Sequence, residues 1–444
     1  RDLQGAEFEV VALVGDGSFN NGLIYEALNS LKILGTRALI ILNDNGMSIS
    51  PTVGGTHEVL EQLKVGSTPL EDVALFERYG LQYMGVYNGN DLEELLPALE
   101  RAKEALRTRS VLLHVTTRKG QGYAFCEREP ERTHGIAPSC AGTEYSSALG
   151  QELTALAGED ERIVAVTAAM TDALGLRPFF DAYPERAFDV GICEEHACVL
   201  SAALAAQGLR PYYAIYSTFL QRAYDEIIHD VCGQNLPVTF CIDRAGVTGA
   251  DGETHQGVFD LSYLSPIPNL TIAIPKNISE FRAMLRLSVS YGKPLAIRYP
   301  REGEEGSSNH IEIGKYEVLH STSSDIIIYA AGERCIRFAE RVLAAARERG
   351  CDATLVNARF LKPVDKELIL SRKETHVITL EDNVLTGGLG DTVARVLRGR
   401  EKVVRSFGYP DIFLPHGQAA ALFEEFGPNF REVLSYLIDC HARG

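Results

Sequence analysis

Two short stretches combine oxygen-bearing side chains with glycine. "GDGSFNNG" holds Asp16 between two glycines, and "NDNGM" holds Asn45. Each follows an aliphatic run, "VVALV" or "ALIIL", and such runs predict buried strands of a parallel sheet. Ligands of these sheets bind beyond the carboxyl ends of the strands, where a carboxylate, an amide oxygen and a backbone carbonyl suit Mg²⁺. The spacing therefore predicts that Asp16 and Asn45 share one magnesium ion.

The glycines around Asp16 suit a phosphate group. Gly15 and Gly17 let the backbone approach an anion closely, and the N-terminus of the following helix favours negative charge. Magnesium also keeps coordination sites open for phosphate oxygens. The alternative is that both stretches are tight turns without a ligand.

A second group of titratable residues lies in "DVGICEEHACV", which predicts a strand, a turn and a helix. Glu194, Glu195 and His196 open that helix, and a buried carboxylate there could do acid–base work. The alternative is an acidic pair that caps the helix. Zinc is not predicted, because no partner pair stands at ligand spacing from Cys193 and Cys198.

Three further stretches carry aromatic and charged side chains in loops or at element ends. An aromatic ring can stack on a planar ligand, and arginine forks suit phosphate monoesters. The stretches are "IYSTFLQRAYDEIIHD" with Tyr216, Phe219 and Arg222; "DRAGVTGADGETHQG" with Arg244, Asp251 and His255; and "RYPRE" with Arg298 and Arg301. A core position for Phe219 and surface ion pairs for the arginines are the alternatives.

Strand and helix patterns alternate along most of the chain, which predicts an α/β protein with three open domains and largely parallel sheets. We predict a first domain over residues 1–125, a linker over 126–143, a second domain over 144–305 and a third over 315–444. The linker is rich in glycine, proline and charge. The chain starts without methionine, so the first domain is expected to be incomplete at its N-terminus.

Composition narrows the class of protein. The 444 residues carry a formal net charge of −17 and no basic cluster, which does not favour nucleic-acid binding. The nine cysteines are scattered without a CxxC pair, which predicts free thiols in a reducing compartment. No stretch reaches the roughly 18 apolar residues of a membrane helix, so no membrane partner is expected.

The chain resembles one known family. GDG followed by NDN is similar to the diphosphate-binding motif of thiamine diphosphate enzymes. "NDNGMSISPTVGG", "YSTFLQRAYDEIIHDVCGQNLPVTFCIDRAGVTGADGETHQGVFDLSYL" and "NARFLKPVD" resemble the 1-deoxy-D-xylulose-5-phosphate synthase family, and the resemblance covers essentially the whole chain. It implies a transketolase-like architecture, with a thiamine-binding fold twice and a transketolase C-terminal domain. One departure is Glu195, which stands where the family motif has glutamine.

The resemblance also implies roles for single residues. Asp16, Asn45 and the Met47 carbonyl would hold Mg²⁺, and Glu194 would activate the cofactor at its aminopyrimidine ring. The other residues expected beside the cofactor are Gly15, Gly17, Ile49, Lys119, Phe219 and Arg222. Those expected at the substrates are Tyr216, Arg244, Asp251, Arg298 and Arg301, with Arg301 favoured over Arg298 for the phosphate. His255 and His134 would act in proton transfer or substrate orientation.

The implied reaction is decarboxylation of pyruvate and transfer of the remaining two-carbon unit to D-glyceraldehyde 3-phosphate. The product, 1-deoxy-D-xylulose 5-phosphate, feeds isoprenoid and thiamine synthesis in this family, whose members are homodimers. A cytoplasmic, bacterial-type location is expected, with a plastid as the alternative. Two alternatives remain for the function. One is another transketolase-group enzyme. The other is a catalytically incomplete, cofactor-binding form, because the family's stretch before Arg1 and its insertion between Thr56 and Asp72 are lacking.

Overall fold

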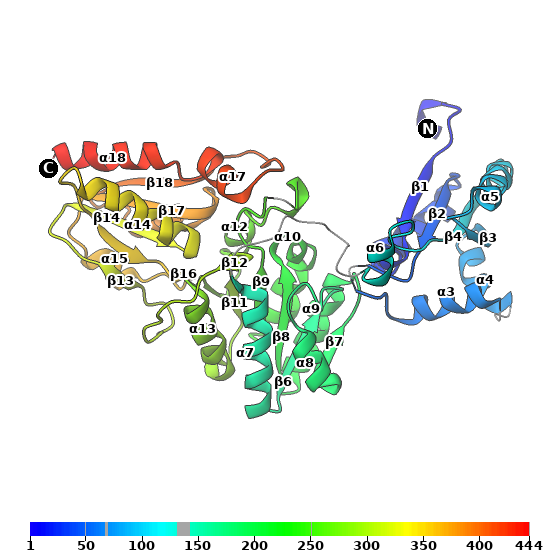
Figure 1. The fold of residues 1–444 in the computed structure, drawn as a ribbon, viewed down its shortest axis with the longest axis horizontal. Coiled ribbons are helices and arrows are strands. Elements are labelled where there is room, and N and C mark those ends of the chain that lie inside the picture. The colour runs from blue at the N-terminus through cyan, green and yellow to red at the C-terminus, as the bar shows by residue number, and fades with distance from the viewer. Residues whose placement is uncertain (49, 67–69, 131–142, 250, 444) are drawn as a thin grey trace. The chain divides into compact units, whose positions relative to one another are not determined.

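The computed structural model describes residues 1–48, 50–66, 70–130, 143–249 and 251–443. The chain forms two compact units. The first unit is built mainly from the residues up to 130, and the second mainly from the residues after 143 (Figure 1). Each unit is an α/β structure, as the alternating sequence pattern predicts.

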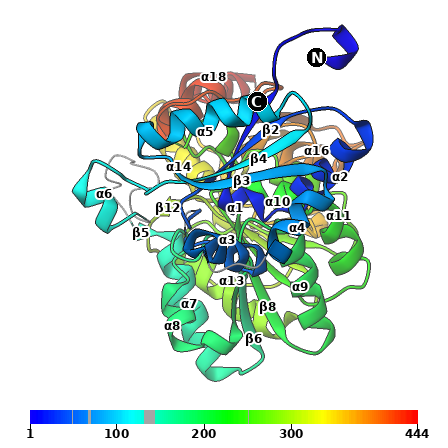
Figure 2. The same ribbon diagram turned by 90° about the vertical axis from the view of Figure 1, so that its right-hand side faces the viewer.

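The first unit holds a four-stranded sheet in the order β1-β2-β4-β3, and all its strand pairs are parallel. Its elements are β1 (Val11–Gly15), α1 (Asp16–Phe19), α2 (Gly22–Leu34), β2 (Leu39–Asp44), α3 (Gly55–Val65), α4 (Leu70–Arg78), β3 (Leu81–Asn88), α5 (Leu92–Ala105), β4 (Ser110–Thr116) and α6 (Ala124–Arg128). Figure 2 shows α5 on one face of this sheet and α3 and α4 on the other. The helix α6 begins before the predicted linker and ends inside it; residues 131–142 of that linker lie outside the described residues.

The prediction that β1 is a buried strand is wrong. β1 is an edge strand, and the side chains of Val11 and Leu13 are 54% and 71% exposed. They pair in register with Leu39 and Ile41, which belong to the core under α5. The aliphatic run correctly indicates a strand, but its burial depends on helices that the local pattern does not report.

The helices of the first unit begin and end at residues that suit their positions. Asn21 caps α2 by accepting a hydrogen bond from the Leu23 amide at 3.0 Å, and Gly35 ends that helix in the left-handed region. Asp91 caps α5 in the same way through the Glu93 amide at 2.9 Å. The caps of α2 help to explain why the amphipathic stretch "GLIYEALNSLKIL" forms a helix over its whole length.

The second unit contains a seven-stranded sheet in the order β16-β10-β11-β9-β8-β6-β7. Its strands are β6 (Ile163–Thr167), β7 (Ala187–Asp189), β8 (Arg210–Tyr216), β9 (Thr239–Asp243), β10 (Thr271–Ala273), β11 (Leu295–Arg298) and β16 (Phe360–Lys362). Its main helices are α7 (Tyr145–Glu159), α8 (Arg177–Ala182), α9 (Glu194–Ala206), α10 (Ser217–Leu220), α12 (Asp260–Leu264) and α13 (Ile278–Tyr291). The six strands that precede residue 300 alternate with these helices along the chain, as the sequence pattern predicts.

The same unit holds a five-stranded sheet in the order β13-β15-β14-β17-β18. Its elements are β13 (Glu317–His320), β14 (Ile326–Ala331), α14 (Glu333–Arg347), β15 (Thr354–Asn357), α15 (Lys366–Ser371), β17 (His376–Val384), α16 (Leu389–Val396), β18 (Val403–Tyr409), α17 (Ala419–Phe426) and α18 (Phe430–Arg443). One hydrophobic core joins α14, α17 and α18 to this sheet and also includes Val247 and Val258 from the loops after β9. The loops after β9 therefore share apolar packing with the five-stranded sheet.

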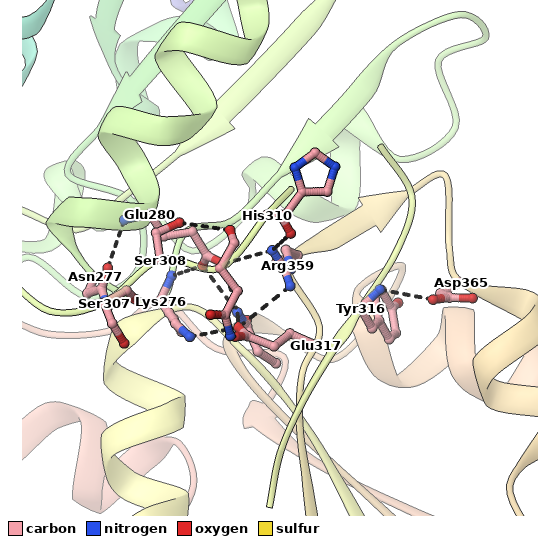
Figure 3. Close-up of polar contacts among 12 residues, drawn as sticks. Lys276, Asn277, Glu280, Ser307, Ser308, His310, Tyr316, Glu317, Arg359 and Asp365 are labelled. Atoms are coloured by element: carbon pink, nitrogen blue, oxygen red, sulfur yellow. Dashed lines mark hydrogen bonds and ion pairs between the residues drawn. The ribbon is translucent and has the colours of Figure 1, made fainter. Parts of the chain in front are cut away.

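Backbone pairing also joins the two sheets. β16 follows β15 in sequence but pairs antiparallel with β10, so the later part of the chain supplies an edge strand to the earlier sheet. A buried polar network lies beside this junction (Figure 3). Glu280 accepts from the Lys276 amide at 2.7 Å and from Asn357 at 3.1 Å, and Arg359 lies 3.4 Å from Glu280 and 3.6 Å from Glu317.

Two predictions from composition can be compared with the described residues. Cys126, Cys198, Cys232, Cys241, Cys335 and Cys351 are free thiols, as expected for a chain without a disulfide framework. Within the part of the chain that the structure describes, none of the helices combines the length and the apolar character that a membrane crossing requires.

Candidate functional site

The predicted magnesium ligands meet at the carboxyl ends of two neighbouring strands. β1 and β2 are adjacent and parallel, and Gly15 pairs in register with Asn43. The Asp16 carboxylate, which is 1% exposed, accepts from the Asn45 amide at 3.3 Å and from the Thr52 hydroxyl at 2.6 Å. Burial raises the pKa of Asp16, and the Thr52 hydrogen bond opposes that shift. The structure thus brings Asp16 and Asn45 together as the sequence predicts.

The turn after β2 is held by several local hydrogen bonds. The Asn45 side-chain oxygen accepts from the Met47 amide at 3.0 Å, and the Gly46 carbonyl accepts from the Thr52 amide at 2.9 Å. The Lys119 ammonium group reaches the same turn and donates to the Ser48 carbonyl at 2.5 Å. Asn45 and Met47, predicted to share the metal, and Lys119, predicted beside the cofactor, therefore lie around one loop. Ile49, the remaining predicted residue of this loop, lies outside the described residues.

The glycines near Asp16 differ in what surrounds them. A Cβ atom on Gly17 would lie 2.9 Å from the Ser48 Cβ, so this position needs glycine for α1 to approach the turn. A Cβ atom on Gly15 would meet nothing within 4 Å. There is open space beside Gly15, which is compatible with the predicted approach of a phosphate group.

Sequence reasoning missed the residues that support this loop. The Asp44 carboxylate accepts from Lys64 Nζ at 2.8 Å and contacts His114 Nε2 at 2.9 Å, and His114 Nδ1 lies 2.8 Å from the Tyr83 hydroxyl. Burial would raise the pKa of Asp44, but the hydrogen bonds from His114 and Lys64 outweigh it and lower that pKa. The one available signal was a histidine inside the otherwise apolar strand "SVLLHV".

Glu194 is the first residue of α9 and is 3% exposed. Its Oε2 lies 3.4 Å from Arg222 Nη1 but accepts a hydrogen bond from none of the described residues. Burial raises the pKa of Glu194, and the nearby Arg222 charge opposes the shift. Arg222 also lies 3.6 Å from Glu195, whose side chain is 38% exposed, so the acidic residue in place of glutamine has a cationic partner.

Three predicted aromatic residues form a continuous stack. The rings of Tyr216 and Phe219 are parallel with centroids 5.7 Å apart, and His255 meets Phe219 edge-on at 5.3 Å. The Arg244 guanidinium lies over the Tyr216 ring, 4.5 Å from its centroid. Phe219 is half-buried and part of this stack, so it is not simply a core residue. The four side chains could contact one planar or anionic ligand.

Arg244 is held in an uncommon conformation by its neighbour. Its φ is +55°, in the left-handed region that disfavours residues other than glycine, and such strain is frequent at functional sites. The Asp243 carboxylate accepts from both the Arg244 amide at 2.6 Å and Nη1 at 2.7 Å. Sequence reasoning missed Asp243, which lies at the end of β9 and is fully buried.

The two arginines of "RYPRE" differ in their surroundings. Arg298 is 4% exposed and donates to Asp260 at 2.9 Å and to the Asp382 carbonyl at 3.0 Å. Its predicted role in substrate binding disagrees with these contacts, because the buried guanidinium already donates its hydrogen bonds to groups of the protein. Arg301 is half-buried and donates to Glu144 at 3.2 Å. Asp251 is exposed in its loop, and His134 lies outside the described residues.

Among the described residues, no three His, Cys, Asp or Glu side chains converge as a set of metal ligands. The predicted magnesium site contains only one such side chain, Asp16, together with an amide oxygen and a carbonyl. The residues present fit a hard cation that is shared with an anionic ligand, and they do not fit a site built from protein ligands alone.

Three families match consecutive parts of the chain. Residues 1–72 and 64–117 match the family described as 1-deoxy-D-xylulose-5-phosphate synthase. Residues 141–303 match the transketolase pyrimidine-binding domain, and residues 314–433 match the transketolase C-terminal domain.

Curated relatives match nearly the whole chain. The 1-deoxy-D-xylulose-5-phosphate synthase of Clostridium tetani is 40% identical over 98% of this chain and 78% of its own length. The synthases of Pelotomaculum thermopropionicum and Listeria monocytogenes are 40% and 41% identical over 100% and 96% of this chain, and 77% and 74% of their own.

Solved structures show the same architecture. A structure titled as a split gene transketolase, an inactive β4 tetramer, has a TM-score of 0.61 at 28% identity, covering 68% of this chain and 99% of its own. The transketolase of Campylobacter jejuni has a TM-score of 0.57 at 17% identity, covering 98% of this chain and 77% of its own, which shows the fold alone.

Proposed function

This chain belongs to the 1-deoxy-D-xylulose-5-phosphate synthase family. We propose that it catalyses the synthesis of 1-deoxy-D-xylulose 5-phosphate with thiamine diphosphate as cofactor. Pyruvate loses carbon dioxide, and its remaining two carbons are joined to the aldehyde carbon of D-glyceraldehyde 3-phosphate. The product is 1-deoxy-D-xylulose 5-phosphate, a precursor of isoprenoids.

The observation that carries the proposal is the environment of Glu194. Its Oε2 is buried and accepts no hydrogen bond from the described residues, which leaves a carboxylate oxygen for a ligand. Burial favours the protonated form of Glu194, so it can donate to or accept from a ring nitrogen. A carboxyl group of this kind fits the aminopyrimidine of thiamine diphosphate. When bound, this cofactor supplies the carbanion chemistry that amino-acid side chains lack.

The first unit holds a group of residues that suits a diphosphate. Asp16, the Asn45 side chain and the Met47 carbonyl would hold Mg²⁺, and Lys119 adds a positive charge at the same loop. The open space at Gly15 leaves room for phosphate oxygens. Each of these groups is of the chemical type that a magnesium–diphosphate ligand requires.

The aromatic stack is the proposed platform for the reacting groups. Phe219 and Tyr216 would exclude water, and His255, which meets Phe219 edge-on, would move a proton or orient the acceptor aldehyde. Arg244 and Arg301 would bind the acceptor phosphate. Arg244 is already held by Asp243, which lowers the entropy lost on binding.

Product formation tests the proposal directly. The chain is mixed with thiamine diphosphate, Mg²⁺, pyruvate and D-glyceraldehyde 3-phosphate, and the product is identified by mass spectrometry. Glu194→Gln is the matched variant, because it keeps the shape of the side chain but cannot exchange the proton. We expect it to bind the cofactor with similar affinity and to lose more than about 100-fold in turnover, as removal of a general acid–base does. Near-normal turnover of this variant would show that Glu194 is not the residue that exchanges the proton.

A second candidate function is cofactor binding without catalysis. The alignment with the Clostridium tetani synthase spans 486 positions, more than the 444 residues of this chain, so the relative has additional residues within the matched region. The match to the synthase family is also divided into two parts that meet near residues 64–72. Cofactor binding by calorimetry without product would support this second function.

The remaining proposals concern the metal, the assembly and the location. Mg²⁺ as the cation, a homodimer and a cytoplasmic location rest on the family resemblance. Removing Mg²⁺ with EDTA should abolish cofactor binding, and adding Mg²⁺ back should restore it. Light scattering after size-exclusion chromatography should give twice the 48.6 kDa mass of one chain.

A further inference from the structure

A chain of polar side chains crosses the sheet of the first unit and ends at the proposed metal-binding turn. It begins at Tyr83 on β3, passes through His114 on β4 and reaches Asp44 at the end of β2. The side chains of His114 and Asp44 are both 0% exposed. These two groups are costly to bury unless they are paired, so their hydrogen bonds fix their arrangement.

The direction of these hydrogen bonds follows from their partners. A carboxylate only accepts, so His114 Nε2 carries the proton that it shares with Asp44 over 2.9 Å. In the tautomer protonated at Nε2 alone, His114 Nδ1 accepts from the Tyr83 hydroxyl at 2.8 Å. Tyr83 thereby holds the histidine in one tautomer and one orientation.

Asp44 in turn fixes the conformation of the turn that follows it. Its Oδ1 accepts from the Gly46 amide at 3.1 Å, and Gly46 stands between Asn45 and Met47. Lys64 Nζ, from α3, contacts the same oxygen at 2.8 Å, so the carboxylate is fixed from both sides. Asn45 and Met47 are the residues whose oxygens would hold the metal.

We propose that His114 is a positioning residue, which fixes Asp44 and through it the turn that presents the Asn45 and Met47 oxygens to the metal–diphosphate group. The inference rests on the proposed function, since it concerns the same cofactor. His114 does not contact the proposed ligands itself but acts through Asp44. We therefore expect its replacement to change the affinity for Mg²⁺.

Two amide variants separate the two hydrogen bonds of His114. In His114→Gln, the terminal amide reaches the position of Nε2 and can donate to Asp44. In His114→Asn, the shorter side chain reaches only the position of Nδ1, so it keeps the Tyr83 contact and loses Asp44. Both variants bury the same chemical group, so their stabilities should be similar. Leu112→Ala, on the same strand and fully buried, is the control for destabilisation alone.

The measurement is thiamine diphosphate binding by isothermal titration calorimetry over a series of Mg²⁺ concentrations. Losing a hydrogen bond to a charged group should raise the half-saturating Mg²⁺ concentration of His114→Asn by about 10- to 100-fold. His114→Gln should stay within about 3-fold of the unmodified chain, and Leu112→Ala should not change it.

Equal Mg²⁺ dependence of the two amide variants, or a shift in Leu112→Ala as large as in His114→Asn, would overturn the inference and leave the proposed function standing. An unmodified chain that binds thiamine diphosphate without any dependence on Mg²⁺ would overturn both the inference and the proposed metal site.

Discussion

Replacing Arg298 with leucine is expected to destabilise the second unit, because it leaves a buried carboxylate without its cation. Arg298 is 4% exposed and Asp260 is fully buried, with Arg298 Nε 2.9 Å from Asp260 Oδ2. The guanidinium also donates to the Gly257 and Asp382 carbonyls, at 3.3 Å and 3.0 Å. These contacts join the loop after β9 to β17, so the loss affects both sheets of the unit.

The size of the effect follows from the burial of both partners. Breaking a buried ion pair from one side typically costs about 3–5 kcal/mol, because the remaining charge cannot reach water. Arg337→Leu is a matched control, since Arg337 is 55% exposed and lies 2.8 Å from Glu304. An exposed pair of this kind should contribute less than about 1 kcal/mol. The free energy of unfolding is measured by urea titration with circular dichroism.

A double variant tests the reasoning itself. If the cost of Arg298→Leu comes from the stranded Asp260 charge, replacing Asp260 with leucine as well should recover much of the lost stability. The explanation is refuted if Arg298→Leu costs less than about 1 kcal/mol, or if the double variant is less stable than Arg298→Leu alone.

Arg301→Leu should raise KM for D-glyceraldehyde 3-phosphate by about 10- to 100-fold and leave KM for pyruvate unchanged; equal changes in both would contradict a role in phosphate binding. Asp16→Ala should abolish Mg²⁺-dependent thiamine diphosphate binding by calorimetry, and unchanged affinity would dismiss the metal assignment. Burial raises the pKa of Glu381 to about 8. Its protonated form therefore favours the folded state at low pH, and that stability is lost as the pH rises through about 8. Urea midpoints should fall between about pH 5 and pH 8, and Glu381→Gln should reduce the difference; a midpoint that rises with pH over this range would contradict the raised pKa.

The sequence predicted the parts of the site that depend on neighbouring strands. GDG and NDN stand after consecutive strands, and consecutive strands of an α/β sheet are often adjacent, so the meeting of Asp16 with Asn45 followed from chain order. The contacts that support the same loop could not be predicted in this way. Lys64 reaches Asp44 from α3, and His114 comes from a strand much later in the chain. Contacts of this kind depend on the three-dimensional position of each side chain.

The two arginines of "RYPRE" illustrate a second limit. Arg298 ends a central strand and points into the protein, and Arg301 lies beyond the strand, half-buried beside Glu144. Three positions apart, they have the same chemistry and different surroundings. Likewise, the aliphatic run of β1 predicts a buried strand, and its exposure follows from its place at the sheet edge.

The pairing of β16 with β10 has a consequence for how this protein can be divided. By sequence, Phe360–Lys362 belongs to the later part of the second unit, but by hydrogen bonding it is the edge of the earlier sheet. Cutting the chain between residues 305 and 315 would therefore produce two damaged halves. One would expose β10 as an unpaired edge, which invites aggregation, and the other would carry a strand without a sheet. The two predicted domains are therefore joined by strand pairing as well as by the chain itself, and we expect them to fold and unfold as one piece.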